Sequence, residues 1–385
     1  MGYKLPNEVN ICIKTLEDAG FEAWCVGGSV RDFIMGKTPS DYDITTNALP
    51  NDIVKHFPHT IPTGIKHGTV TVLINRMPIE VTTYRADGQY HNNRTPDNVS
   101  FLESIDGDLL RRDFTVNAIC YNPKKGVYDP LLGESDINAK IIRAIGNPEE
   151  RFLEDALRIM RAFRFSAQLG FEIEDKTAKK ALELSHLLQN ISVERIYIEL
   201  KKTFVSENPE KLLPLINCGA LSFLGFDKCI FPQNLKNSSA NFNLRFAIFC
   251  NENNLMSDKI LTLLKSDNNA RKTVATFEKM LKLNVANKTD IKKLLYIGGK
   301  EITEEFLQYI DGKTGSNFVE LLHDILLHNE AYSINMLALN GNDIKQAGFA
   351  DKEIGSILQK LLLFVLENPQ SNTPDILKRQ LSLLK

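Results

Sequence analysis

The sequence predicts an α+β protein, in which a head of mixed strands and helices is followed by an all-helical remainder. Three segments within the first 145 residues are rich in β-branched and aromatic residues, as strands are: 23–26, 69–74 and 79–84. Beyond residue 150 these strand signals fade, and helical patterns take over. A chain of 385 residues is also too long for one ordinary core. We therefore expect two to four helix-rich domains.

Helices are predicted on both sides of this change. The amphipathic segment 7–19 ends at Gly20, a residue that commonly terminates helices. Beyond the head, the sequence predicts three consecutive helices, over 150–168, 175–189 and 192–204. The stretch 232–243 is rich in Asn and Ser, and this composition predicts a linker or a long loop.

The composition is that of a soluble globular protein, with 43% apolar and 24% charged residues. The six cysteines are scattered, which argues against a zinc site and a disulfide scaffold and fits a reducing cytosol. The N-terminus lacks the pattern of a signal peptide. The longest late apolar run, 361–366, is far too short for a membrane span. We expect a cytoplasmic protein with no membrane partner.

Charge is unevenly distributed along the helical part. The net charge of −2 gives no hint of a nucleic-acid partner. Residues 256–300, however, carry ten Lys and Arg against four Asp and Glu, whereas residues 301–385 carry seven against twelve. A basic run of this kind is usually only a solvated helix face. It becomes a candidate nucleic-acid surface if other features of the sequence point to such a partner.

The segment from Val26 to Ile44, VGGSVRDFIMGKTPSDYDI, carries the strongest sign of chemistry. It predicts a strand that runs into Gly27, Gly28 and Ser29 and then into a helix. Glycines let backbone N–H groups approach a phosphate closely, and a helix N-terminus favours negative charge. The Ser29 hydroxyl and the planar fork of Arg31 could donate further hydrogen bonds to phosphate oxygens. A Gly-Gly turn alone is weak support, so the residues that follow decide the interpretation.

Asp41 and Asp43 are expected on the next strand, where residues two apart point to the same face. Two such carboxylates repel each other, and one or two divalent cations would relieve the repulsion. A two-metal site would activate an attacking 3′-hydroxyl and stabilise the leaving pyrophosphate. Glu80, between Ile79 and Val81, is the candidate third carboxylate, with an exposed strand residue as the alternative. An isolated Asp-x-Asp is more often a solvent-exposed turn, but the nearby Gly-Gly-Ser favours the metal site.

The Gly-Gly-Ser-x-Arg-Asp and Asp-Tyr-Asp motifs resemble the signature of the polymerase-β-like nucleotidyltransferases. With the later motifs GIKHGTV at 64–70 and LRRDFTVNA at 110–118, the chain closely resembles the bacterial (class II) CCA-adding enzymes and poly(A) polymerases. The resemblance implies a polymerase-β-like head in which Asp41 and Asp43 are catalytic and hold two Mg²⁺ ions, while Glu80 stays the candidate third catalytic carboxylate on the strand pattern alone. It also implies that Arg112 binds the triphosphate and that Asn117 supports it, which adds these two to the candidates of the glycine turn, Gly28, Ser29 and Arg31.

The segment 151–165, RFLEDALRIMRAFRF, resembles the family's Glu-Asp-x-x-Arg motif. We expect one helix that carries Asp155, Arg158, Arg161 and Arg164 along one stripe, because residues three apart are neighbours on a helix. Surface salt bridges are the alternative, but apolar residues fill the other faces, and buried charges need partners such as a nucleotide. The resemblance implies that the first two hydrogen-bond the base of CTP or ATP through its amine and ring acceptors. The other two would contact phosphate or hold the first two in place.

The resemblance also implies how the chain is divided. The expected parts are a catalytic head at 1–145, a base-selecting neck at 146–204, a basic tRNA-binding body at 205–300 and a tail at 301–385. The stretch 86–101 matches the position of the family's flexible loop, although the family often has more basic residues there than the His-Asn-Asn-Arg of this chain.

The partners implied by the resemblance are CTP, ATP and the 3′ end of tRNA. Four lysines of the basic run are spaced to form basic faces on two successive helices, and they are candidates for tRNA binding: Lys279, Lys282, Lys292 and Lys293. An acceptor stem is double-stranded RNA, so such contacts would be to phosphates rather than to base sequence.

Other functions stay open at this point. Poly(A) polymerases share the motifs up to Arg164, but they usually end in strongly basic tails, whereas the last 85 residues of this chain are acidic. An enzyme that adds only the terminal A would have nearly the same sequence. A non-catalytic nucleotide- or RNA-binding module would not need its carboxylates and arginines together. His323 and Asp324 could suggest a metal phosphohydrolase, but an ordinary pair on a helix surface fits better without a second His cluster.

Overall fold

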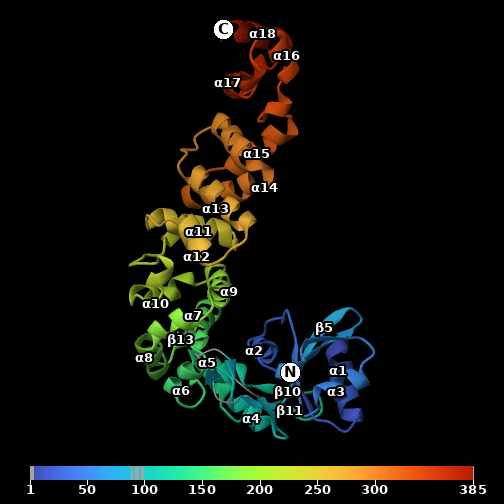
Figure 1. The fold of residues 1–385 in the computed structure, drawn as a ribbon. Helices are drawn as coiled ribbons and strands as arrows, with labels where there is room; N and C mark the ends of the chain where they lie inside the picture. Colours follow the sequence, from blue (N-terminus) through green and yellow to red (C-terminus); the bar gives the residue numbers. More distant parts are fainter. Residues whose placement is uncertain (1–3, 88–89, 92–94, 97–98, 385) are drawn as a thin grey trace. The chain divides into compact units, whose positions relative to one another are not determined.

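The computed structural model describes residues 4–87, 90–91, 95–96 and 99–384 (Figure 1). The chain forms two compact units, Met1–Cys229 and Ile230–Lys385. The predicted borders after residues 145 and 204 fall inside the first unit, and the predicted body crosses the division between the units. The four-part division therefore stays a prediction about function.

The first unit contains a seven-stranded sheet in the order β11-β10-β1-β2-β5-β4-β3. Its strands are β1 (Ala23–Val26), β2 (Asp43–Thr46), β3 (Thr60–Gly64), β4 (Thr69–Ile74), β5 (Met77–Thr83), β10 (Cys120–Asn122) and β11 (Gly126–Tyr128). The three predicted strands are β1, β4 and β5. Strands β2 and β5 pair in parallel, and the other pairs of this sheet are antiparallel. The parallel register places Asp43 directly beside Glu80.

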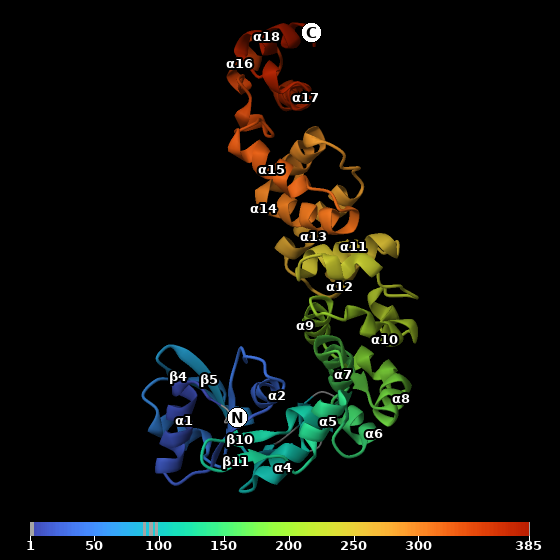
Figure 2. The same cartoon turned by 180° about the vertical axis from the view of Figure 1, so that it is seen from behind.

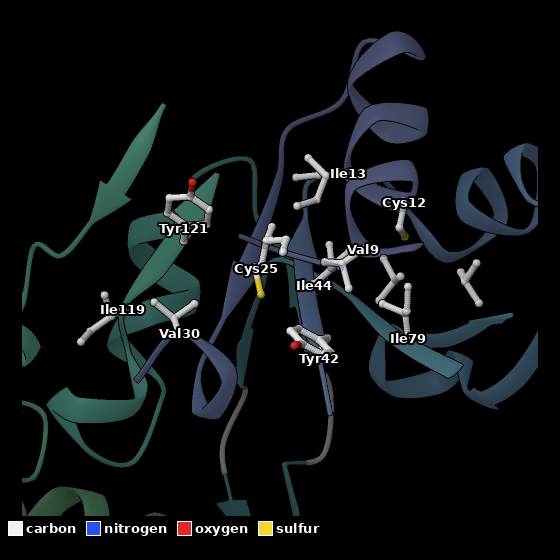
Figure 3. Packing of buried hydrophobic residues seen from close by; sticks show 14 of the residues in the cluster. Val9, Cys12, Ile13, Cys25, Val30, Tyr42, Ile44, Ile79, Ile119 and Tyr121 are labelled. Carbon is white, nitrogen blue, oxygen red and sulfur yellow. The ribbon is translucent and has the colours of Figure 1, made fainter. Parts of the chain in front are cut away.

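The larger core of this unit lies on one face of the sheet. Helices α1 (Asn7–Asp18) and α3 (Pro50–His56) lie close together on that side (Figure 1), with α2 (Gly28–Ile34) beside β1. Val9, Cys12 and Ile13 recur at helical spacing on α1 and pack over Ile44 and Ile79 (Figure 3). Full burial of each aliphatic side chain contributes about 1.5–3 kcal/mol. This face therefore anchors the strands that carry Asp43 and Glu80.

The opposite face of the sheet has a smaller core. Trp24 and Val26 alternate with the residues of β1 that face α1, and they pack with Tyr84. Helix α4 (Ile105–Leu110) adds Ile105 and Leu109 to this cluster. The sheet is thus covered on both faces, and polar side chains at the ends of its strands are left to line a site.

The stretch predicted as a flexible loop contains short strand pairs. Strand β6 (Arg85–Asp87) pairs with β9 (Val99–Phe101), and β7 (Tyr90–His91) pairs with β8 (Thr95–Pro96). Most of the His-Asn-Asn-Arg segment, residues 92–94, lies outside the described residues.

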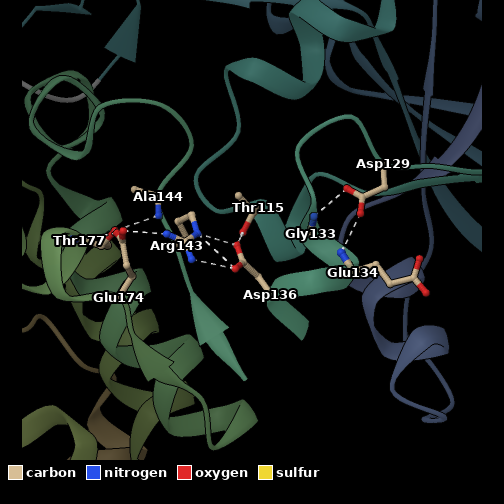
Figure 4. Close-up of polar contacts among 9 residues, drawn as sticks. All are labelled: Thr115, Asp129, Gly133, Glu134, Asp136, Arg143, Ala144, Glu174 and Thr177. Carbon is tan, nitrogen blue, oxygen red and sulfur yellow. Dashed lines mark hydrogen bonds and ion pairs between the residues drawn. The ribbon is translucent and has the colours of Figure 1, made fainter. Parts of the chain in front are cut away.

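A polar network joins the head to the helices that follow (Figure 4). Arg143 pairs with Asp136 of α5 (Gly133–Ala139) at 3.0 Å and with Glu174 at 2.8 Å, immediately before α8 (Asp175–Glu183). Thr115 donates to Asp136 at 2.7 Å. Gly133 is required here, because a Cβ atom at this position would lie 2.3 Å from the Thr115 carbonyl oxygen. The network fixes α8 against the part of the head that contains the Arg-Arg-Asp-Phe-Thr motif.

The predicted helix over 150–168 is wrong as a single element. The structure has two helices, α6 (Pro148–Glu154) and α7 (Leu157–Leu169), with Asp155 between them in extended conformation (φ −137°, ψ 102°). The Asp155 carboxylate accepts the backbone N–H of Leu157 at 3.1 Å. Aspartate commonly forms such local bonds, and they compete with a continuous helix.

Two further helices complete this part of the first unit. The predicted helix 175–189 is α8 followed by a 3₁₀ turn, η3 (Ser185–Asn190), and the predicted helix 192–204 is α9 (Val193–Phe204). Figure 2 shows α9 next to α7, and the two helices pack against each other.

The second unit is helical throughout its described residues. Its helices are α11 (Phe242–Glu252), α12 (Ser257–Leu263), α13 (Asn268–Leu281), α14 (Lys288–Thr314), α15 (Phe318–Leu327), α16 (Gly341–Gln346), α17 (Ile354–Glu367) and α18 (Pro374–Ser382). Gly299 (φ 72°) kinks α14 next to the border predicted after residue 300. The predicted linker at 232–243 lies just after the start of this unit. None of the helices in the described part of the chain has the length and hydropathy to cross a membrane. The mixed head and the helical remainder confirm the predicted α+β class.

Candidate active site

A cavity of about 1240 Å³ opens in the first unit. Its walls come from the sheet, from α2, from the segment after α4, and from α7 and α9. It brings together nearly all the predicted catalytic and nucleotide-binding residues: Gly28, Arg31, Asp41, Asp43, Glu80, Arg112, Asn117, Asp155, Arg158, Arg161 and Arg164. This convergence of residues from distant motifs marks the cavity as the candidate active site.

The acidic end of the cavity is built by β2 and β5. Asp43 begins β2, Glu80 lies beside it on β5, and both side chains are exposed on the cavity side. Tyr42 packs into the core against Phe33. The expectation that Asp41 and Asp43 share a strand is wrong, because β2 begins at Asp43 and Asp41 lies just before it, but both aspartates line the cavity. Although Asp43 is open to the cavity, the surrounding protein atoms partly desolvate its carboxylate, and this effect, followed by the charges of Glu80 and Asp41, raises its pKa to about 6 against the opposing effect of Arg112. The protein alone therefore leaves this negative charge poorly compensated.

These carboxylates suit a hard divalent cation. Mg²⁺ prefers oxygen ligands, and it commonly binds through one or two carboxylates together with waters and substrate phosphates. Among the residues that the structure describes, no group of three His, Cys, Asp or Glu side chains is arranged to hold a metal ion by itself. Asp41 and Asp43, with the raised pKa of Asp43, thus fit a Mg²⁺ site that a substrate would complete. Glu80 is a neighbour of that site, and its part as a third carboxylate stays a prediction.

The glycine turn has the backbone geometry expected of a phosphate loop. Gly27 precedes α2 with φ 81°, a conformation that favours glycine, and a Cβ atom there would lie 3.4 Å from Nη1 of Arg112. The expectation for the Ser29 hydroxyl is wrong, because this side chain is buried. It donates to the Val26 carbonyl oxygen at 3.3 Å and contacts Cys25. Only the backbone of Ser29 is left as a candidate for binding phosphate.

Arg112 is held by a buried carboxylate that the sequence reasoning missed. Asp108 of α4 accepts from Arg111 at 2.7 Å, from Arg112 at 3.2 Å and from Thr45 at 3.1 Å. Burial acts to raise the pKa of Asp108, but the two arginines lower it overall. Nε of Arg112 is buried without a hydrogen-bond partner among the described residues. Asp108 precedes the two arginines by three and four residues, a spacing that brings side chains together on a helix, and this spacing could have predicted the cluster.

A second missed carboxylate, Asp113, connects the head with the neck. It accepts from Asn117 at 3.1 Å and from Nε of Arg161 at 2.6 Å. Although burial acts to raise the pKa of Asp113, Arg161 and Asn117 lower it to about 2. Asn117 in turn accepts from Arg31 of α2 at 2.6 Å. One chain of hydrogen bonds thus fixes both an arginine of the phosphate loop and an arginine of α7.

Phe165 lies under three arginines of the cavity. Its ring centroid is 3.6 Å from the guanidinium carbon of Arg164, 5.2 Å from that of Arg161 and 5.4 Å from that of Arg31. Arg164 also pairs with buried Glu199 of α9 at 2.6 Å. Burial lowers the pKa of Arg164 to about 10, against the opposing charge of Glu199. Phe165, which lines the cavity, and Glu199, which lies behind Arg164, were missed, because nothing in the sequence shows that they meet these arginines.

The two predicted base-selecting residues do not share one helical stripe. Asp155 lies between α6 and α7 and pairs with Arg195 of α9 at 2.8 Å. Arg158 lies in the first turn of α7, where it pairs with Glu154 at 2.6 Å and donates to the carbonyl oxygen of Arg111 at 2.8 Å. Both side chains nevertheless line the cavity.

The four predicted tRNA-binding lysines fall into two groups in the second unit. Lys279 and Lys282 are exposed at the end of α13. Lys292 is only 1% exposed and pairs with Glu330 at 2.9 Å, so its expected place on a basic surface is wrong. Lys293, on α14, is half-buried and lies 3.4 Å from Asp290. Tertiary packing of α14 therefore removes Lys292 from the candidate RNA surface.

Comparison with protein families finds two matches. Residues 23–143 match the poly(A) polymerase head domain, and residues 170–225 match the probable RNA- and SrmB-binding site of polymerase A.

Known proteins resemble this chain, some of them over nearly its full length. The CCA-adding enzyme of Staphylococcus haemolyticus is 34% identical to it over 97% of both chains. The CCA-adding enzyme of Streptococcus uberis is 48% identical over 53% of this chain and 52% of its own length. The crystal structure of the Bacillus stearothermophilus CCA-adding enzyme in complex with CTP superposes with a TM-score of 0.82 at 28% identity, over 97% of each chain. The Thermotoga maritima CCA-adding enzyme complexed with tRNA shares the fold, with a TM-score of 0.65 at 20% identity.

Proposed function

This chain belongs to the family of the CCA-adding enzymes, and we propose that it adds C, C and A to the 3′ end of tRNA. The nucleotides come from CTP and ATP, pyrophosphate leaves, and no nucleic-acid template is used. One observation carries the proposal. A single cavity joins the carboxylates Asp41 and Asp43 to Asp155 and Arg158, which suit the recognition of a base.

The acidic end is the proposed place of the chemistry. Asp41 and Asp43 would hold Mg²⁺, and Glu80 would add negative charge beside them. Mg²⁺ bound there would supply a Lewis acid for the phosphates and would favour ionisation of the attacking 3′-hydroxyl. The backbone at Gly28 and the side chains of Arg31 and Arg112 would bind the triphosphate. Because hydrogen bonds to carboxylates and to Asn117 already fix these arginines, little reorganisation is needed when the substrate enters.

The other end is the proposed place of base selection. The Asp155 carboxylate is an acceptor and would pair with the exocyclic amine that cytosine and adenine share. Uracil and guanine present a carbonyl oxygen at the matching position, and a carboxylate would repel it. Arg158 would donate to a ring nitrogen or a carbonyl oxygen of the same base. Its fixed contacts with Glu154 and with the Arg111 carbonyl hold the guanidinium in place for that role.

The remaining assignments also belong to the proposal. The neck, with α7 and α9, would carry base selection. Exposed Lys279 and Lys282 of the second unit would contact tRNA phosphates. All six cysteines are free, which supports a reducing compartment such as the cytoplasm.

The test uses two tRNA transcripts, one that lacks CCA and one that ends in CC, each with a single nucleoside triphosphate and Mg²⁺. We expect CTP to be incorporated on the first transcript and ATP on the second, with addition stopping after the terminal A. Use of ATP on the second transcript without use of CTP on the first would reassign the enzyme to A addition alone. Long A tails on unrelated RNA would reassign it to poly(A) synthesis.

A further inference from the structure

Asp155 is held from two sides at the break between α6 and α7. Its backbone is extended, so the hydrogen bonds of a helix do not fix its direction. Instead, Oδ1 accepts from the N–H of Leu157 at 3.1 Å. The guanidinium of Arg195 spans both oxygens, with Nη2 at 2.8 Å from Oδ2 and Nη1 at 3.4 Å from Oδ1. The orientation of this carboxylate therefore depends on a residue 40 positions later in the chain.

The packing of helix α9 fixes the position of Arg195. It lies in the first turn of α9, where neighbouring Ile196 and Leu200 are buried in the core. Glu199, also on α9, pairs with Arg164 of α7 in a buried contact of 2.6 Å. Arg195 itself lines the cavity, and about a third of its side chain is exposed there. The helix thus presents the guanidinium to Asp155 at a fixed position.

This arrangement matters for discrimination between bases. A carboxylate has about four acceptor sites, and Leu157 and the two nitrogens of Arg195 occupy about three of them. A carboxylate held in this way presents its acceptor in a fixed direction. A carboxylate that turns freely could bind an amine or a carbonyl oxygen through a bridging water molecule, and it would discriminate less between them. The planar fork of arginine suits this task, because it grips both oxygens at once.

We propose that Arg195 is a positioning residue for base selection: it orients the Asp155 carboxylate so that the site accepts the amine of cytosine or adenine and rejects the carbonyl oxygen of uracil. This inference rests on the proposed function, in which Asp155 reads the base. It assigns Arg195 no contact with the reacting atoms.

The test compares kcat/KM for CTP with kcat/KM for UTP, on tRNA lacking CCA, in four variants: Arg195→Ala, Arg195→Lys, Asp155→Asn and the double variant Arg195→Ala/Asp155→Asn. Asp155→Asn should lower the preference for CTP by about 5- to 150-fold, because the amide can donate to a carbonyl oxygen and one base-edge pairing is removed. Arg195→Ala should lower the preference in the same direction, by at least about fivefold. Arg195→Lys, which keeps the charge but lacks the fork, should restore only part of it.

The double variant isolates the mechanism. If Arg195 acts through Asp155, Arg195→Ala/Asp155→Asn should be no less selective than Asp155→Asn alone. Lys202→Ala is the matched control, since Lys202 also lies on α9 and lines the cavity, and its ammonium has no partner among the described residues. This control removes one positive charge from the same wall; because any loss of tRNA binding affects CTP and UTP alike, the ratio of their kcat/KM values should be unchanged. Thermal unfolding of each variant checks that it is folded.

Two outcomes separate this inference from the proposed function. If Asp155→Asn leaves the CTP preference unchanged, Asp155 does not read the base, and both ideas fail. If Asp155→Asn relaxes selection while Arg195→Ala does not, the inference alone is overturned. In that case, a raised KM for tRNA in Arg195→Ala would assign the guanidinium to an RNA phosphate.

Discussion

The two units of this protein both bury charged side chains, but they do so in different settings. In the first unit, Arg161 and Arg164 are paired with Asp113 and Glu199 while they line an open cavity. In the second unit, Lys292 is paired with Glu330 and is closed off from solvent at 1% exposure. Pairing alone therefore does not distinguish a functional charge from a structural one. The distinction lies in whether the paired group also faces space that a ligand can enter.

A similar contrast exists within the cavity between two carboxylates. Asp113 has a guanidinium partner, and its pKa is lowered to about 2. Asp43 lies beside two other carboxylates, and its pKa is raised to about 6. Asp113 is thus satisfied by the protein and organises its neighbours, whereas the charge of Asp43 is less well compensated by the protein, as the proposed Mg²⁺ site would require. Carboxylates whose environments separate their pKa values in this way commonly have different roles.

The largest expected effect is on Asp43. Asp43→Asn keeps the size of the side chain but removes a charged ligand for Mg²⁺, so incorporation of both CTP and ATP should fall by at least about 10³-fold. Binding of tRNA, measured by filter retention, should stay within about twofold of wild type. Asp227→Asn, at an exposed position of the same unit, is the matched control and should retain full activity. Residual turnover of Asp43→Asn within tenfold of wild type would contradict the metal assignment.

The same variant should be more stable than wild type when no metal is present. The pKa of Asp43 in the folded protein is about 6, above the ordinary value of 3.8, so the folded state holds this proton more tightly than the unfolded state does. Protonation of Asp43 therefore stabilises the folded state. This contribution is complete below pH 3.8 and is lost as the pH rises through about 6. In EDTA at about pH 7.5, Asp43→Asn should therefore have a higher Tm than wild type, and the difference should vanish near pH 4.

Added Mg²⁺ provides the counterpart of this measurement. It should raise the Tm of wild type by binding the folded state, and it should raise that of Asp43→Asn much less. If Asp43→Asn is no more stable than wild type in EDTA at about pH 7.5, the negative charge of Asp43 is already compensated by other groups of the protein.

Local patterns in the sequence were sufficient for several parts of this site. The two-residue period of a strand predicted that Glu80 points away from the core, and the Asp-x-Asp motif predicted two carboxylates at one site, although Asp41 lies before β2 rather than on it. The pairing of β2 with β5, which places Glu80 beside Asp43, could not be predicted because it joins segments distant in the chain. Membership in the CCA-adding family, expected from the ordered motifs, is confirmed.

The errors have physical causes of two kinds. At Asp155, a local side-chain bond to the Leu157 N–H overrode a helical pattern that otherwise continues. At Ser29 and Lys292, burial was decided by tertiary packing. Ser29 turns toward Val26 in the core, and Lys292 meets Glu330, which lies 38 residues later. The spacing of basic residues cannot reveal such a partner, because exposed and buried lysines follow the same helical periodicity.

A smaller effect is expected at Lys292, where a substitution tests whether this buried charge stabilises the second unit and has no part in function. Lys292→Met should destabilise the second unit by about 3 kcal/mol, at the lower end for a broken buried ion pair, because Glu330 keeps its contact with Lys288. Urea unfolding followed by circular dichroism measures this change in stability. Lys292→Met/Glu330→Gln should recover part of it, since the glutamate charge that has lost one of its two lysine partners is removed. Lys293→Met, at a half-exposed pair on the same helix, is the control and should change stability by less than about 0.5 kcal/mol.

Activity gives the second half of this test. At a temperature where Lys292→Met is folded, its kcat for CTP incorporation should match that of wild type. A stable Lys292→Met variant with weakened tRNA binding would instead return this residue to the RNA surface.

The smallest expected effect concerns Lys279 and Lys282, which differ from Lys292 in being exposed. No side-chain partner is found for either lysine among the described residues, so both ammonium groups are free to contact phosphate. Lys279→Ala/Lys282→Ala should weaken binding to all tRNAs alike, most strongly at low salt. It should reduce the slope of log affinity against log salt by up to about two, roughly one for each phosphate that is no longer neutralised. Lys4→Ala/Lys14→Ala changes the net charge equally on the first unit and should leave the slope unchanged. Equal slopes for the two double variants would move the RNA surface away from α13, and the exposed Lys202 of α9 would then be the next position to test.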